Sequence, residues 1–160
     1  MRLNKNLLNF NLRRFLKIIK KIYNILLDIR RKSMEEKNNE LLDSINEWRT
    51  KNDSESFKKV VEQIKNESFY CPIKIEEDGS KMIAITKNAK GDSLLLAFTS
   101  KEEAQKWSKD LTITYEIHSF EQYANLLLME SNNNLGFVIN PYGVNLALDK
   151  KIIRDIKGNN

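Results

Sequence analysis

The stretch SLLLAFTSKEEAQKW, residues 93–107, decides the fold of this chain. Ser93–Thr99 is an almost unbroken apolar run, which is typical of a central strand buried on both faces. Ser100 follows, and Glu103 three positions later completes the capping-box pattern that begins a helix. The stretch therefore predicts a buried strand that passes directly into a helix ending near Trp107.

Two further strands are expected before this junction. Phe69–Ile75 (FYCPIKI) and Lys81–Lys87 (KMIAITK) read as strands, and the turn Glu76–Ser80 between them contains Gly79. Glycine supplies the positive φ that a tight hairpin turn requires. Pro72 has no N–H to donate, which favours an edge position or a strand start for its segment.

Strand and helix patterns alternate again after the junction. The expected elements are a strand at Thr112–His118, a helix capped by Ser119 with Gln122, strands at Gly136–Asn140 and Asn145–Leu148, and a closing helix capped by Asp149. This order predicts an α+β fold with a mixed or antiparallel sheet, helices mainly on one face, and amphipathic helices preceding it at the N-terminus.

Apolar residues at helical spacing predict those preceding helices. One is expected from Met34 to about Thr50, and another begins at Asp53 or Ser54, either of which is a suitable N-cap. The chain is thus expected to comprise a basic amphipathic helix over residues 1–33, a helical lead-in over 34–67 and an α+β domain over 69–157.

The first of these segments combines a broad apolar surface with a basic one. Residues 1–32 contain ten Lys or Arg and one acid, a net +9, so the rest of the +5 chain carries −4. The cations expected to contact a membrane or a partner are Arg13, Arg14, Lys17, Lys20 and Lys21. Such a helix fits an anionic membrane surface or an acidic protein groove. Packing on its own domain is an alternative, and so is an upstream extension that is not always present before Met34.

Three lysines argue against a secretory signal or a membrane-spanning helix. Lys17, Lys20 and Lys21 interrupt the apolar run Phe15–Leu27, and each central lysine costs roughly 2.5–3.5 kcal/mol in hydrocarbon. The single cysteine, Cys71, favours a reducing compartment. We expect a cytoplasmic protein that is either soluble or peripheral at the inner face of the membrane.

The sequence does not assemble the residues of a familiar enzyme site. His118 stands alone, whereas a metal site needs three or four ligands. Cys71 reads as a small buried side chain, and there is no phosphate loop, dinucleotide fingerprint or nucleophile elbow. We therefore expect no catalytic residues, no cofactor and no bound metal.

The best candidate for an interaction site is the turn between the last two strands. It consists of Asn140, Pro141, Tyr142 and Gly143. Asn140 is suited to an Asx-type turn, Pro141 presets φ and Gly143 eases the exit. A purely structural turn and a binding loop with an exposed Tyr142 both fit this pattern.

Three segments carry a resemblance to a known family. They are FYCPI at 69–73, LAFTSKEEAQKW at 96–107 and GFVINPYGVNLAL at 136–148. From Phe69 to Ile156 the chain resembles the N-terminal domain of the bacterial SseB family. The resemblance implies an α+β domain, a mostly cytoplasmic setting and no catalytic residues that could be transferred to this sequence.

These observations favour a non-catalytic, SseB-like protein-interaction module with an unidentified protein partner. The basic helix would tether it to an anionic membrane or an acidic partner. The alternative is a nucleic-acid-associated protein that binds phosphates through the basic arm. The arm has few stacking aromatics and the folded part is acidic, which favours the first hypothesis.

Overall fold

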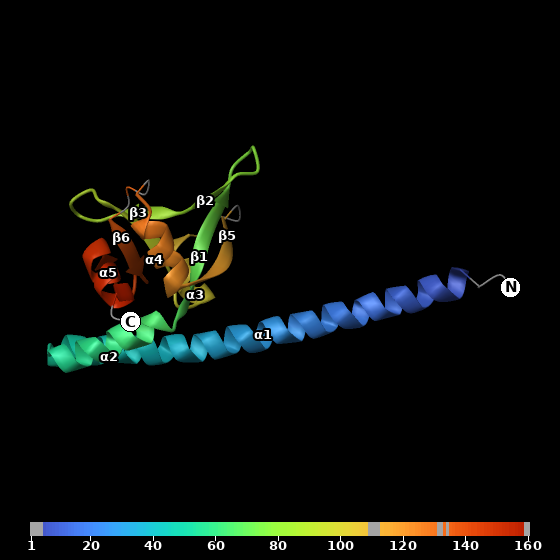
Figure 1. Ribbon diagram of the computed structural model, residues 1–160, viewed down its shortest axis with the longest axis horizontal. Coiled ribbons are helices and arrows are strands. Elements are labelled where there is room, and N and C mark those ends of the chain that lie inside the picture. Colours follow the sequence, from blue (N-terminus) through green and yellow to red (C-terminus); the bar gives the residue numbers. More distant parts are fainter. Residues whose placement is uncertain (1–4, 109–112, 131–132, 134, 159–160) are drawn as a thin grey trace. The chain divides into compact units, whose positions relative to one another are not determined.

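The computed structural model describes residues 5–108, 113–130, 133 and 135–158, with side chains from residue 12 onward. The chain divides into two compact units, Met1–Met34 and Glu35–Asn160. Figure 1 shows the helices and strands, coloured along the sequence. In the part of the chain so described, no helix is both long and apolar enough to cross a membrane.

Helix α1 (Lys5–Lys51) is continuous, whereas the sequence predicted separate helices before and after residue 33. The intervening residues include neither Pro nor Gly, so nothing stops the helix from propagating. The predicted break after Thr50 is confirmed, because α1 ends at Lys51 and Asn52 has a φ of 52°. Asp53 then caps α2 (Ser54–Lys65) by accepting the Ser56 N–H at 2.7 Å.

The described strands form two sheets. One has the order β2 (Lys81–Ile83), β1 (Ser68–Ile75), β5 (Ile113–Ser119), and the other β3 (Ile85–Lys87), β4 (Ser93–Ala97), β6 (Gly136–Ile139), β7 (Leu146–Asp149). β4 and β6 run parallel and the other pairs antiparallel. Tyr70 and Phe98 join the sheets through two backbone hydrogen bonds of 2.8 and 3.0 Å. The predicted α+β fold is confirmed. Thr112, the expected first residue of β5, lies outside the described residues.

Two details of the first strands differ from the prediction. The segment Lys81–Lys87 is divided at Ala84 into β2 and β3, which belong to different sheets. Pro72 lies inside β1, between two partner strands, and not at an edge or a strand start. Proline has no backbone N–H to donate. Pro72 is tolerated here because it faces Ala84, where the pairing with β2 has ended and no donor is needed. The Pro72 carbonyl still accepts the Ala84 N–H at 2.9 Å.

The central strand behaves as its composition predicted. β4 lies between β3 and β6, and its residues Leu94–Ala97 are buried. β6 is buried along its whole length, and a Cβ added at Gly136 would lie 2.0 Å from the Leu148 carbonyl oxygen. Glycine is therefore required at this position by the close approach of β7.

The remaining helices are α3 (Lys101–Trp107), α4 (Phe120–Leu128) and α5 (Lys150–Gly158). The predicted capping box of α4 is confirmed, with both Ser119–Gln122 bonds present. Asp149 caps α5 by accepting the Ile152 N–H at 2.8 Å. At α3 only half of the box forms, because the Glu103 carboxylate pairs with Lys106 and not with the Ser100 backbone.

The core lies between the sheet and helices α2, α4 and α5. Tyr123 is at its centre, stacked on Phe137 at a centroid distance of 5.0 Å and edge-on to Phe69 at 6.2 Å. Its hydroxyl donates to the Leu96 carbonyl at 2.7 Å, which satisfies its only polar group. Leu41 and Ile45, from the part of α1 in the second unit, belong to the same cluster.

Candidate functional site

The Asn140 turn follows β6 where the carboxyl ends of the parallel strands β4 and β6 lie side by side. Asn140 is only 2% exposed, and its φ is 46°. Its Oδ1 accepts the Thr99 N–H at 3.0 Å, and its Nδ2 donates to the Thr99 Oγ1 at 2.7 Å. The predicted Asx-type role is therefore replaced by a tie between two strands. The turn is closed instead by the Asn140 carbonyl, which accepts the N–H groups of Gly143 and Asn145.

Gly143 does not use the backbone freedom of glycine, and it lies close to α3. Positive φ angles fall on Asn140 and Asn145, while Gly143 is not among the glycines with positive φ. A Cβ at Gly143 would lie 3.0 Å from the Glu103 Oε2. That oxygen is buried and has no hydrogen-bond partner among the described residues, although the same carboxylate pairs with Lys106. The turn thus packs directly on α3.

Tyr142 is the side chain that the turn presents to solvent. It is 69% exposed, whereas Pro141 is half-buried and Asn140 is buried. An exposed aromatic ring on a rigid turn can bury apolar area against a partner at little cost in conformational entropy. The structure thus places Tyr142 where a contact is possible, and its role as a contact stays a prediction.

Two residues of α1 donate to backbone carbonyls near the Asn140 turn. Asn38 Nδ2 donates to the carbonyls of Ser68 at 3.0 Å and Thr99 at 2.8 Å. Arg49 donates to the carbonyls of Val144 and Asn145. Sequence reasoning did not identify either residue, because their partners are 30 to 96 positions away. No local pattern signals pairing over that distance.

The predicted cations Arg13, Arg14, Lys17, Lys20 and Lys21 all lie on α1 in the first unit, and all are exposed. A helix turns by about 100° per residue, so positions around its axis follow from the sequence. The cations between residues 12 and 32 occupy an arc of about 120°, with Arg30 as the exception. Asp28 and Asn24 lie within the same arc.

Apolar side chains span about 200° of the remaining circumference, and Arg30 lies among them. The large apolar side chains are between 46% and 60% exposed: Leu12, Phe15, Leu16, Ile18, Ile19, Ile22, Tyr23, Ile25, Leu26 and Ile29. A stripe of this width exceeds the narrow seam of a two-stranded coiled coil. The segment from Leu12 to Ile29 is therefore a basic apolar helix with a large unpartnered face.

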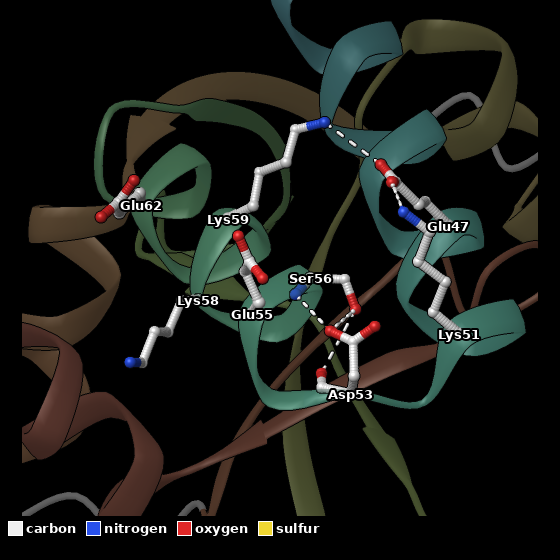
Figure 2. Close-up of a pocket in the computed structure, with 8 residues that line it drawn as sticks. All are labelled: Glu47, Lys51, Asp53, Glu55, Ser56, Lys58, Lys59 and Glu62. Carbon is white, nitrogen blue, oxygen red and sulfur yellow. Dashed lines mark hydrogen bonds and ion pairs between the residues drawn. The ribbon is translucent and has the colours of Figure 1, made fainter.

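A surface cleft between the end of α1 and α2 has polar walls (Figure 2). Glu47 lies between Lys51 at 2.6 Å and Lys59 at 3.1 Å, and these hydrogen bonds lower the pKa of its carboxyl. Asp53 is occupied by the Ser56 cap, which lowers its pKa as well. Of these contacts, the Glu47–Lys59 pair joins α1 to α2, whereas the Lys51 contact lies within α1 and the Ser56 contact is the cap of α2.

Two side chains of potentially reactive types, His118 and Cys71, are held in contacts within the fold. His118 Nε2 lies 3.3 Å from the Glu116 Oε2, and its ring packs on Tyr123. Cys71 is buried, and desolvation raises the pKa of its thiol to about 11, so it is protonated at neutral pH. Within the described ranges, no group of three or more His, Cys, Asp or Glu side chains could hold a metal ion.

Comparison with known proteins gives one match. The SseB protein N-terminal domain matches residues 41–155. The match begins inside α1. It therefore includes helical residues that precede Phe69, where the resemblance noted in the sequence began. The curated proteins and the solved structures gave no match. The matched region contains the core, the strand-to-helix junction and the Asn140 turn, and the chain belongs to the SseB family.

Proposed function

We propose that this SseB-family chain is a non-catalytic protein-interaction module, held at an anionic membrane surface on the cytoplasmic side by its basic apolar helix. The observation that carries the proposal is the exposure of ten large apolar side chains between Leu12 and Ile29, beside a narrow basic arc. The Asn140 turn, with Tyr142 in solvent, is the part of the domain offered to a protein partner.

An anionic bilayer surface fits this helix in both shape and charge. A helix lying in the headgroup region buries one broad face and keeps the other in water. The basic arc borders the apolar face on both sides, through Lys20 and Arg13 at one margin and Arg14 and Lys21 at the other. Lysine and arginine at such margins extend their charged ends to the lipid phosphates while their stems stay in apolar surroundings.

The alternatives explain fewer features of the helix. An acidic protein groove would cover one stripe and leave much of the 200° apolar face exposed, since grooves accept anchors at i, i+3, i+4 and i+7 (about one side of a helix). Nucleic acid would use the basic arc through its phosphates. It would leave the isoleucine-rich face without a role. The membrane surface accounts for both faces.

The proposal that the chain is non-catalytic is supported by the structural roles of its potentially reactive side chains. The Cys71 thiol is buried with a raised pKa, and Ser100 and Ser119 accept helix amide hydrogens. Asn140 and Thr99 bind one another. Each of these groups has a structural task that explains its presence.

Co-sedimentation of the full chain with vesicles tests the tether. We expect binding to vesicles of phosphatidylcholine with phosphatidylserine and much weaker binding to phosphatidylcholine alone. Replacing Arg13, Arg14, Lys17, Lys20 and Lys21 by Gln removes five cations, each contributing about 1 kcal/mol near an anionic surface. The partition coefficient should then fall by roughly three to four orders of magnitude.

A matched variant controls for net charge. Lys58, Lys87, Lys90, Lys101 and Lys151 are exposed residues of the second unit, and replacing them by Gln also takes the net charge from +5 to zero. This control should bind vesicles nearly as well as the unaltered chain. Equal losses in the two variants, or binding to duplex DNA but to neither vesicle, would refute the membrane tether.

A further inference from the structure

The four edge strands of the described sheets differ in how they are protected. β2 and β3 have three residues each and carry Lys81 and Lys87, while β7 has four residues and ends at Asp149. Short length and charge, lysine above all, are the usual means of preventing an edge from pairing with another chain. β5 has seven residues, ITYEIHS, and lacks lysine, proline and glycine; its one carboxylate, Glu116, is paired with Lys81 of β2. Figure 1 shows it at the margin of the folded domain.

The register of β5 with β1 determines which backbone N–H and C=O groups of β5 point away from the sheet. The Pro72 and Tyr70 carbonyls face β2 and β4, so the neighbouring residues Phe69, Cys71 and Ile73 face β5. Their partners on β5 are His118, Glu116 and Thr114. The N–H and C=O groups of Ile113, Tyr115 and Ile117 therefore point away from the sheet, and no hydrogen bond from a described residue reaches them.

We propose that the free edge of β5 pairs with β5 of a second copy of this chain, antiparallel and across a two-fold axis at Tyr115. The order Ile113–Thr114–Tyr115–Glu116–Ile117 is nearly the same in both directions. An axis at Tyr115 sets Tyr115 opposite itself, Ile113 opposite Ile117, and Thr114 opposite Glu116. A surface used in a two-fold contact must be complementary to itself, and this strand is.

This register satisfies the outward backbone groups of β5 and avoids the faults of an axis at Glu116 or Ile117. It supplies about six hydrogen bonds and leaves none of the outward groups of Ile113, Tyr115 and Ile117 unpaired. An axis at Glu116 would set the two Glu116 carboxylates opposite one another, which is destabilising. An axis at Ile117 would pair Tyr115 with Ser119, whose N–H already donates to the Gln122 Oε1 at 2.8 Å.

The side chains on both faces of the strand are compatible with this pairing. Ile113, Tyr115 and Ile117 share the face on which the Tyr115 hydroxyl donates to the Ala104 carbonyl of α3. They would add isoleucine pairs on both sides of a central tyrosine pair, which stabilise antiparallel strands. On the other face, Glu116 is already paired with Lys81 at 2.7 Å and would meet only the Thr114 hydroxyl of the second copy.

Disulfide formation between two single-cysteine variants of the full chain tests the register. Across the proposed axis Thr114 and Glu116 are directly opposite, at a Cα distance of about 4.5 Å, which suits a disulfide. A mixture of Thr114→Cys and Glu116→Cys should therefore form covalent dimers about tenfold faster than either variant alone. The native Cys71 is buried with its thiol protonated, so the unaltered chain should not cross-link.

Asp155→Cys, at an exposed position on α5, measures random collisions. Fastest cross-linking of Glu116→Cys alone would place the axis at Glu116 and overturn the proposal. Equal rates for the mixture and for Asp155→Cys would overturn it as well.

A charge pair at the exposed Thr114 gives a second measurement without cysteine. Thr114→Lys sets a cation opposite Glu116 of the second copy, and Thr114→Glu sets an anion there. Each cross-strand pair contributes roughly 0.2–1 kcal/mol and occurs twice, so the dimer dissociation constant should fall by roughly 2- to 30-fold with Lys and rise comparably with Glu. Sedimentation equilibrium of the full chain measures both. Association of the basic apolar helices affects the two variants alike, so identical dissociation constants would refute pairing through β5.

Discussion

The replacement Asn140→Ala tests whether one buried side chain holds the candidate turn in place. It removes the bond from the Thr99 N–H at 3.0 Å and the bond to the Thr99 Oγ1 at 2.7 Å. An unpaired buried N–H costs about 1–3 kcal/mol, and the hydroxyl bond contributes about 1 kcal/mol more. Alanine must also adopt the φ of 46°, at a cost of about 1 kcal/mol. We expect a total loss of about 3–5 kcal/mol.

Two control variants separate these contributions. Asn140→Gly loses the same hydrogen bonds but tolerates positive φ, so it should be about 1 kcal/mol less destabilised than Asn140→Ala. Asn145→Ala has the same φ of 46° at an exposed position and should lose about 1 kcal/mol only.

Urea denaturation of the full chain, followed by circular dichroism, measures the free energy of unfolding for each variant. With an m-value of about 1–3 kcal/mol per molar, Asn140→Ala should lower the midpoint by about 2 M. If Asn140→Ala and Asn145→Ala lose the same free energy, the bonds to Thr99 contribute nothing. The account of the turn as a tie between β4 and β6 would then be wrong.

Three further predictions concern the second unit. Tyr142→Ala should change the melting temperature by less than about 2 °C, because the ring is 69% exposed; a large loss would place the ring in the core. Gly136→Ala should lose at least about 3 kcal/mol, since its Cβ would lie 2.0 Å from the Leu148 carbonyl oxygen; normal urea stability would contradict the β6–β7 register. Burial raises the pKa of the Cys71 thiol to about 11, so the folded state favours the protonated thiol; the unfolding free energy should fall as pH rises from about 9 to about 11, and a Cys71→Ala variant should lose this dependence.

Most secondary-structure elements of the second unit could be predicted because their signals are local. A capping residue and the amide hydrogen that it accepts are three positions apart, as at Asp53, Ser119 and Asp149. The continuous apolar composition of β4 likewise predicted burial on both faces. The failures have different causes. At α3 a second local partner, Lys106, lies three positions from Glu103 and binds the carboxylate that the capping box would use. At Ala84 a strand that alternation had predicted to be continuous is divided, and Ala84 bonds to Pro72 and Leu96, each 12 positions away.

The candidate turn shows the same division. Its position and its exposed tyrosine followed from the sequence NPYG, but the reason for each residue did not. Asn140 was expected to bond locally, and it bonds to Thr99 across 41 positions. Gly143 was expected to relieve the backbone, but its φ is not positive and it lies beside Glu103.

The sequence by itself determined the α+β class, the family and the two faces of the basic apolar helix, because periodicity, caps and charge are properties of neighbouring residues. Only the tertiary structure decided that Pro72 lies inside a sheet, that Asn38 and Arg49 donate to backbone carbonyls beside the turn, and that β5 is the longest edge strand of the described sheets. Strand order and register depend on contacts between residues far apart in the chain. The free energy of those contacts depends on the packing of the whole core and not on any single segment of the sequence.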